Sequence, residues 1–329
     1  MPDDRTTVFD FEKELFELRM FRLFEHFADS QLRALLHLAR AERVDDGDRI
    51  FAEGEAGEDF FILVAGAVDL LRQASSEVRT VGRLRVGQIV GEESFVDALV
   101  RPASAIATQP GLLLRCDAAQ VRRLMGLLAG FDVALLRAFW FALAAKVRQA
   151  NTFVTELAAG PGPVPAPGSR ESGQDIQLQP SAKLEVFREQ GLTTAEMRLL
   201  ATTLPAQRFS PGATIFFEGE LGDSLYIVVE GGVRIARRRA EAGEETLSLL
   251  GRGEVFGEMA LIEDLPRSAD ARASDILGCT VLRLSRADVD ELLTVEHAAS
   301  AFLQLLCRLL SRRYRSMVNR LASPRPGLD

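Results

Sequence analysis

The chain has few of the residues that build metal sites and disulfide frameworks. Its 329 residues include only three cysteines, and long, irregular intervals separate Cys116, Cys279 and Cys307. Such spacing fits neither a metal-ligand motif nor a paired framework. We therefore expect no metal and a reducing compartment, with the cytoplasm as its location.

Histidine is equally scarce, and each of the three lies alone within a helical pattern: His26, His37 and His297. No Ser-His-Asp order and no cluster of titratable residues stands out along the chain. Nucleophilic and general acid-base catalysis need such groups to be brought together. We therefore expect a protein that is not an enzyme.

Excess positive charge and long apolar runs are also missing. The net charge is −8, whereas binding to nucleic acid needs a basic face, so we expect no DNA partner. The longest apolar stretch, 133–147, contains Arg137 and Lys146, which argues against a membrane span or anchor. One arginine cluster near the C-terminus is interpreted as a solvated helix face: Arg308, Arg312, Arg313, Arg315 and Arg320.

An internal repeat organises the chain. Residues 51–68 match 216–233 without a gap, and 87–92 match 253–258 after a shift of one residue. Between the copies, 160–168 has proline at alternate positions, which forbids a helix and favours an extended spacer. We expect a first domain at 1–158, a linker at 159–180 and a second domain at 181–329.

Within each copy the hydrophobic pattern predicts strands enclosed by helices. Short runs rich in β-branched and aromatic residues lie at 60–64, 225–229 and 280–284, with glycine turns between them, which is typical of a small barrel or sandwich. Apolar residues follow helical spacing at 15–39 and 182–203. The helical stretch 134–145 is apolar nearly all round, which predicts burial on most faces, and a further helical stretch lies at 299–321. The fold class is therefore predicted to be α+β.

The most informative segment is 253–273. Gly257 and Glu258 form a pair, and Arg267 follows Glu258 by nine residues, just after Pro266 and before small residues. This run resembles the phosphate-binding cassette of the cyclic-nucleotide-binding domain family, which includes bacterial catabolite activators and protein kinase A regulatory subunits. The resemblance implies two β-barrel or jelly-roll domains, each flanked by N-terminal and C-terminal helices.

The resemblance also implies a ligand site in the second copy. In the family the glutamate accepts from the ribose 2′-hydroxyl, and the arginine holds the cyclic phosphate, a task that suits a planar guanidinium. The carried-over site residues are Phe256, Gly257, Glu258, Met259, Ala260, Arg267, Ser268 and Ala269. Because a single hydroxyl, that of Ser268, follows the arginine, we favour cAMP as the ligand over cGMP.

The first copy departs from this pattern, and its weaker candidates are Gly91, Glu92, Arg101 and Ser104. A gapless alignment places Arg101 opposite Arg267 but puts Pro102, which has no N–H, beside it. A shifted alignment restores the amides and leaves Ala103 in the arginine's place. Each alignment loses one phosphate contact, and Glu93 adds a negative charge. We interpret the first copy as degenerate.

These features predict a non-catalytic cyclic-nucleotide receptor that signals to a protein effector through movement of a hinge helix. The alternative is an interaction scaffold that binds no nucleotide. The chain stops at Asp329, after the second hinge helix, so we expect no DNA-reading module. A homodimer through the C-terminal helices is a further expectation. For Trp140 and Tyr314, the two aromatic candidates for a base cap, core packing is the favoured interpretation.

Overall fold

The computed structural model describes residues 11–74, 77–157, 170–189, 204–239 and 243–323. The chain divides into two compact units, of which the first contains 1–150 with 310–329 and the second contains 151–309. The expected spacer at 160–168 lies outside the described residues. Each unit is described by itself.

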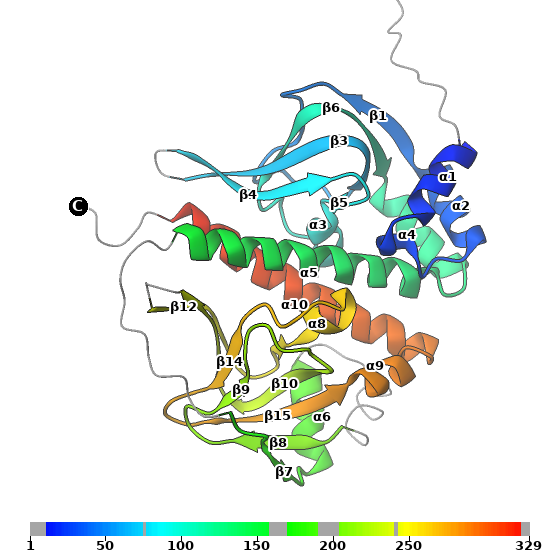
Figure 1. Ribbon diagram of the computed structural model, residues 1–329. Helices are drawn as coiled ribbons and strands as arrows, with labels where there is room; N and C mark the ends of the chain where they lie inside the picture. Colours follow the sequence, from blue (N-terminus) through cyan, green and yellow to red (C-terminus); the bar gives the residue numbers. More distant parts are fainter. Residues whose placement is uncertain (1–10, 75–76, 158–169, 190–203, 240–242, 324–329) are drawn as a thin grey trace, which may run out of the picture. The chain divides into compact units, whose positions relative to one another are not determined.

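The first unit combines one antiparallel sheet with helices at both ends of its sequence (Figure 1). Its elements are α1 (Phe11–Arg19), a 3-10 turn η1 (Arg22–Phe24), α2 (Asp29–Leu38), β1 (Arg40–Val44), β2 (Arg49–Phe51), β3 (Phe60–Gln73), β4 (Val78–Arg85), β5 (Ile89–Val90), α3 (Glu92–Asp97), β6 (Ser104–Cys116), α4 (Ala118–Leu127) and the start of α5 (Phe131–Leu157). The strand order is β1-β6-β3-β4, with β2 on β6 and β5 on β3.

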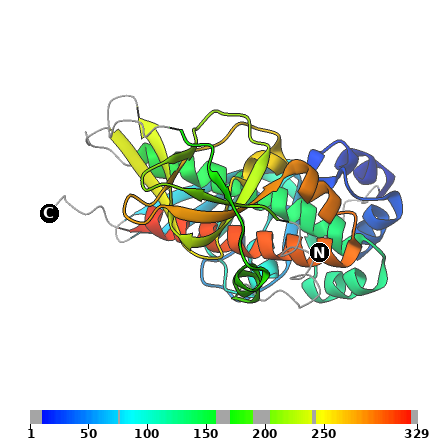
Figure 2. The same ribbon diagram turned by 90° about the horizontal axis from the view of Figure 1, so that it is seen from below.

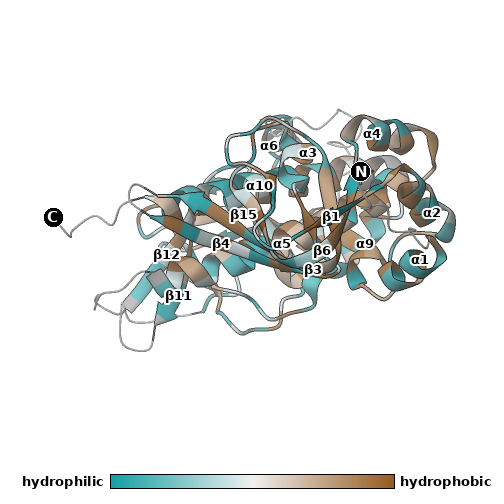
Figure 3. Cartoon of the chain, turned by 90° about the horizontal axis from the view of Figure 1, so that it is seen from above, coloured by the Kyte–Doolittle hydropathy of each residue, from teal (hydrophilic) through white to brown (hydrophobic). Residues whose placement is uncertain are grey.

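The helical pattern at 15–39 is divided rather than continuous. Phe21 is extended, and α2 begins afresh at Asp29, where the Gln31 side chain accepts from the backbone N–H of Ala28 at 2.9 Å. Figure 3 shows that α1, α2 and α4 carry both hydrophilic and hydrophobic residues, as helices packed on one side do.

Long strands give the first sheet its curvature. β3 and β6 pair along most of their length, with register shifts near Ala65 and Ala67. Gly66 at this bend has φ of 90°, and an added Cβ would lie 2.9 Å from Gly111 Cα. Two strands therefore approach so closely here that only glycine fits.

Aromatic packing fixes the short helix α3 in this unit. Phe95 on α3, Phe60 on β3 and Phe139 on α5 meet edge to face, with ring centroids 5.0 to 5.6 Å apart. All three side chains are buried. The position of α3 is therefore set by the strand beneath it and by helix α5.

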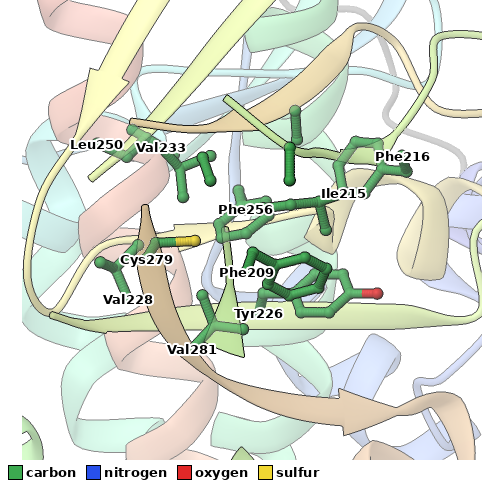
Figure 4. Close-up of a cluster of buried hydrophobic side chains, with 13 residues drawn as sticks. Phe209, Ile215, Phe216, Tyr226, Val228, Val233, Leu250, Phe256, Cys279 and Val281 are labelled. Atoms are coloured by element: carbon green, nitrogen blue, oxygen red, sulfur yellow. The ribbon is translucent and has the colours of Figure 1, made fainter. Parts of the chain in front are cut away.

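The second unit is a sandwich of two antiparallel sheets, of order β13-β10-β15-β8-β7 and β12-β11-β14-β9. Its elements are β7 (Gln174–Ile176), α6 (Pro180–Glu189), β8 (Ala206–Phe209), β9 (Thr214–Phe216), β10 (Ser224–Gly231), β11 (Val233–Arg239), β12 (Gly243–Leu250), β13 (Val255–Phe256), α8 (Glu258–Glu263), β14 (Asp270–Ala273), β15 (Cys279–Ser285), α9 (Arg286–Leu292) and the start of α10 (Glu296–Ala322). Both sheets contribute side chains to one core (Figure 4), among them Phe216, Tyr226 and Phe256. The predicted α+β class is confirmed.

Helix α10 continues unbroken from Glu296 to Ala322 (Figure 2). From Leu310 onward its residues group with the first unit, whereas the last residues of α5, from Asn151, group with the second. Each compact unit thus includes the end of the other copy's long helix. Among the described helices, none is long and apolar enough to cross a bilayer.

Glycine substitutions test the close approach of β3 and β6. Gly66→Ala combines positive φ with a backbone clash, whereas Gly47→Ala, at φ of 88° with nothing within 4 Å, introduces the strain alone. We expect Gly47→Ala to lower the free energy of unfolding by about 1 to 2 kcal/mol and Gly66→Ala by about 1 to 3 kcal/mol more. Urea unfolding followed by the fluorescence of Trp140, the single tryptophan, measures both. Equal losses would contradict the clash.

Candidate functional site

Arg267 is the centre of the second copy's site. Its Nη1 donates to Gly257 O at 2.5 Å and its Nη2 to Ser224 O at 2.7 Å. The guanidinium carbon lies 4.1 Å from the centroid of the Phe216 ring, and the residue is 5% exposed. Burial lowers the pKa of Arg267, and neighbouring acidic groups oppose that effect. Within the described part of the chain, its Nε has no hydrogen-bond partner.

Two glycines make room for this guanidinium. Gly257 has φ of 80°, and an added Cβ would lie 2.6 Å from Arg267 Nη1. An added Cβ on Gly222 would lie 2.6 Å from Arg267 Cζ. Side chains at these positions would expel the arginine, so the Gly-Glu pair reflects packing as well as turn geometry.

The other sequence-predicted residues of this site lie around the same short segment. Glu258 begins α8 and is 1% exposed, and Met259, Ala260 and Ala269 are buried. Ser268 Oγ lies 3.8 Å from Met259 Sδ. Phe256 ends β13 and faces the core, stacked 5.0 Å from Tyr226. The structure therefore brings the predicted residues together on β13, α8 and the loop before β14.

Sequence reasoning missed the residues that brace the arginine's loop. The backbone N–H of Gly219 donates to Arg267 O at 2.9 Å, and that of Arg267 donates to Glu220 O at 2.8 Å. Asp270 Oδ1 accepts from the Glu218 N–H at 2.7 Å. Phe216 and Gly219 lie at the start of the gapless repeat, so the sequence did mark them. Repetition alone, however, does not indicate what they do.

The first copy holds Arg101 in the same way. Nη1 donates to Gly91 O at 2.9 Å and Nη2 to Asp59 O at 2.6 Å. The guanidinium carbon lies 4.4 Å from the Phe51 ring centroid, and Gly54 N–H donates to Arg101 O at 3.0 Å. These contacts correspond one for one to those of Arg267, so the gapless alignment matches the geometry and the alternative with Ala103 does not.

The two sites differ next to the arginine. Pro102 occupies the position of Ser268 and has no N–H to donate. Ser104 Oγ accepts from the Glu53 N–H at 2.9 Å, where the second copy uses Asp270. Ser104 therefore braces the loop in this structure.

The most distinctive feature of the first copy is a buried ionic cluster. Lys146 Nζ on α5 lies 2.7 Å from Glu92 Oε2 and 2.7 Å from Glu93 Oε1. All three side chains are at most 3% exposed. Glu93, which was expected to add a negative charge close to the anion, is thus paired with Lys146 within the protein. Lys146 interrupts an apolar run, and no sequence spacing linked it to this cassette.

Burial and the neighbouring Glu93 carboxylate raise the pKa of Glu92 to about 8, although Lys146 opposes the shift. Burial alone would lower the pKa of Lys146, but the two carboxylates outweigh it and raise that pKa. One ammonium therefore faces two carboxyl groups, of which that of Glu92 holds a proton more readily than an ordinary glutamate does.

The two candidate base caps are buried, as core packing predicts. Trp140 is 2% exposed and Tyr314 is 0% exposed. The Tyr314 ring centroid lies 5.9 Å from Lys146 Nζ, within the first unit. Arg315 was expected on a solvated face, but its side chain is 15% exposed and is paired with Asp97. Among the described residues, no group of acidic, histidine or cysteine side chains is suited to hold a metal ion.

Comparison with known proteins places these two cassettes in one family. A family model described as "Cyclic nucleotide-binding domain" matches residues 41–126 and 206–295. A cAMP-dependent protein kinase regulatory subunit of Yarrowia lipolytica is 27% identical over 79% of this chain and 56% of its own length. The cyclic AMP receptor protein of Thermus thermophilus is 42% identical over 25% of this chain and 38% of its own length.

Among solved structures, the regulatory domain of Toxoplasma gondii PKA with cAMP is 21% identical. The match covers 88% of this chain and 94% of that one, with a TM-score of 0.34. The chain spans about half the length of the yeast relative, so the activity of a whole regulatory subunit is not transferred with the match.

The buried ionic cluster of Glu92, Glu93 and Lys146 predicts a pH dependence of stability. The folded pKa, about 8, exceeds the ordinary 4.5, so the stabilisation linked to this proton is complete below about pH 4.5 and is lost as pH rises through about 8. From pH 5 to 8 we expect the first unit's free energy of unfolding to fall more in the wild type than in Glu92→Gln, by about 1 to 3 kcal/mol.

Trp140 fluorescence during urea unfolding measures this difference. Glu77→Gln is the matched control, because Glu77 belongs to the same unit and its side chain is 58% exposed. Parallel pH profiles for the wild type and Glu92→Gln would contradict the raised pKa.

Proposed function

Because the chain belongs to the cyclic-nucleotide-binding domain family, we propose that it is a non-catalytic regulatory protein that binds cAMP in its second copy. The observation that carries the proposal is the buried guanidinium of Arg267, which is held by two carbonyl oxygens and keeps Nε without a partner among the described residues. A charge in this position can bind a phosphodiester through a strong, charge-assisted hydrogen bond.

Glu258 gives the site its second polar group. Nine residues separate it from Arg267, and both are buried beside Gly257. A carboxylate that accepts from a neutral ribose hydroxyl needs no cation of its own if it is held apart from the phosphate. The pair therefore suits a ligand that carries an anionic group and a neutral hydroxyl at separate positions.

The preference for cAMP rests on Ser268. It is the only hydroxyl among the three residues that follow Arg267, and its Oγ contacts the sulfur of Met259. Ala269 and Asp270 have no hydroxyl group that could help to recognise guanine. The related proteins named for cAMP agree with this preference.

The first copy is proposed to bind the nucleotide more weakly. Pro102 removes one backbone donor from the phosphate subsite, and Lys146 already neutralises the cassette's carboxylates. One hydrogen bond to a charged group contributes roughly 1.5 to 3 kcal/mol, which corresponds to a tenfold to hundredfold difference in affinity. We further propose a cytoplasmic location, where the three free, buried cysteines remain reduced.

Arginine variants test the assignment of the site. Arg267→Ala in the full chain is expected to weaken cAMP binding by about 2 to 5 kcal/mol, roughly thirtyfold or more, because the phosphate loses its charged partner. Arg101→Ala, which removes the equivalent contacts in the first copy, is the matched control and is expected to leave the dominant affinity unchanged. Isothermal titration calorimetry measures both variants.

Arg267 also bonds two backbone carbonyls, so circular dichroism must show that the variant remains folded. Glu258→Gln provides a second, nearly isosteric variant, and weaker binding is expected because the ribose hydroxyl loses an ionised acceptor. Affinity within threefold of wild type in both folded variants would overturn the proposed site.

Stoichiometry gives an independent prediction. We expect one tightly bound cAMP per chain, weaker binding of cGMP, and a first site at least about tenfold weaker than the second. Calorimetric titration of the full chain with each nucleotide counts the sites. Two equivalent cAMP sites would contradict the degenerate first copy, and the absence of binding would favour an interaction scaffold.

A further inference from the structure

The end of α10 is bound to the cassette of the first copy by an ionic contact. Within the unit formed by 1–150 and 310–329, Arg315 Nε lies 2.7 Å from Asp97 Oδ2, and its Nη2 lies 2.9 Å from Asp97 Oδ1. Arg315 Nη1 donates to Val100 O at 2.6 Å, and Ser311 Oγ donates to Asp97 Oδ2 at 2.7 Å. Asp97 is the last residue of α3.

This contact has the geometry of specific recognition. Two nitrogens of one guanidinium meet both oxygens of one carboxylate, an arrangement that lysine cannot reproduce. The Asp97 side chain is 7% exposed, so solvent screens the pair only weakly. An incidental surface ion pair would be exposed and freely exchanging, whereas this one is enclosed and has a third bond to a backbone carbonyl.

Further contacts follow the same helix. Tyr314 is fully buried, and its ring faces Lys146, which bonds Glu92 and Glu93 at the other end of α3. Nearer the C-terminus, Arg72 Nη2 donates to Asn319 Oδ1 at 3.0 Å. Arg72 Nη1 donates at 2.6 Å to the carbonyl of Pro102, the residue after Arg101. The end of α10 therefore contacts α3 directly at Asp97. It is linked to the other end of α3 through Lys146 and to the arginine loop of the first copy through Arg72.

The beginning of the same helix follows the second cassette. In the second unit, Arg286 on α9 donates to Leu261 O at 3.0 Å and pairs with Asp264 at 2.7 Å. Leu261 lies on α8, and Asp264 is its C-cap. Only a few residues separate α9 from Glu296, where α10 begins. A continuous helix thus connects the element bonded to one cassette with the residues bonded to the other.

We propose that the first copy is the receiver of the second copy's signal, with Asp97 as the docking residue for Arg315 at the end of α10. The inference rests on the proposed function, since it takes the ligand of the second site to be cAMP. The binding partner of this helix end is then the degenerate cassette of the same chain. A docking surface needs the shape of the cassette, which the first copy keeps. It does not need a phosphate subsite equivalent to that of the second copy.

Hydrogen exchange of the full chain with and without cAMP tests the proposal. In the wild type, cAMP is expected to alter protection at 257–269 and at 92–104. In Arg315→Ala the change at 257–269 is retained and that at 92–104 is lost. Arg312→Ala, which removes an exposed arginine of the same helix, is the matched control and retains both changes. In Arg267→Ala both are lost, which excludes direct occupation of the first copy as their cause.

Calorimetry provides a second readout through linkage. If docking and nucleotide binding are coupled, Arg315→Ala shifts the cAMP dissociation constant by at least about fivefold, and Arg312→Ala leaves it within about twofold. Arg315→Lys is expected to resemble Arg315→Ala, because a single ammonium cannot replace the two-nitrogen contact.

Each outcome bears on one of the two claims. A wild type that responds at 257–269 but not at 92–104 overturns the receiver role and leaves the proposed function standing, and so does a remote response that persists in Arg315→Ala. A wild type that binds no cAMP overturns both. The wild-type comparison alone can refute the coupling, even where a variant fails to fold.

Discussion

The structure of both cassettes depends on one buried arginine that lies over a phenylalanine ring. Arg267 lies over Phe216, and Arg101 over Phe51, each with two carbonyl oxygens as hydrogen-bond acceptors. A guanidinium tolerates such a site better than an ammonium does, because it is weakly hydrated and stacks on aromatic rings. Burying an unneutralised charge still costs free energy, and carbonyl dipoles offset only part of that cost. The fold therefore carries a cation that an anion of suitable shape would stabilise.

The two copies deal with buried charge differently. In the second, the apolar Met259 follows Glu258. The Nε of Arg267, like that of Arg101, has no hydrogen-bond partner among the described residues. In the first, Glu93 replaces that methionine and Lys146 enters from α5 to pair with both carboxylates. The protein itself supplies the counter-charge there. Such a cluster is costly to disrupt, because removing one partner leaves an uncompensated ion behind, and it joins α5 to α3.

Features encoded by local pattern could be predicted from the sequence. The gapless repeat, the strand runs and the cassette from Gly257 to Ala269 all rest on residues close to one another in the chain, and the structure brings them together. Arg101 could be aligned in two ways because proline lies near the arginine in both copies, at 102 and at 266. The hydrogen bonds to Gly91 and Asp59 and the contact with the Phe51 ring distinguish the alternatives, and Asp59 and Phe51 are distant from Arg101 in sequence.

The remaining features come from tertiary contacts that leave no periodic signal. Lys146 looked like an interruption of an apolar helix, and Arg315 looked like one solvated arginine among five. Lys146 is buried against Glu92 and Glu93 of α3, and Arg315, whose side chain is 15% exposed, is paired with Asp97 of the same helix. Sequence shows where a helix is encoded, whereas the unit with which its end packs depends on tertiary contacts.

This distinction bears on what a degenerate repeat contributes. A copy that had merely decayed would be under no constraint to keep a buried arginine, a glycine at positive φ and a short helix in place, because each is costly unless compensated. The first copy keeps all three, and its α3 carries at one end the carboxylates that bind Lys146 and at the other the carboxylate that binds Arg315. Pro102 lacks the backbone N–H that a phosphate site would use. This proline, which we propose to weaken nucleotide binding in the first copy, leaves the contacts of α3 with Lys146 and Arg315 in place.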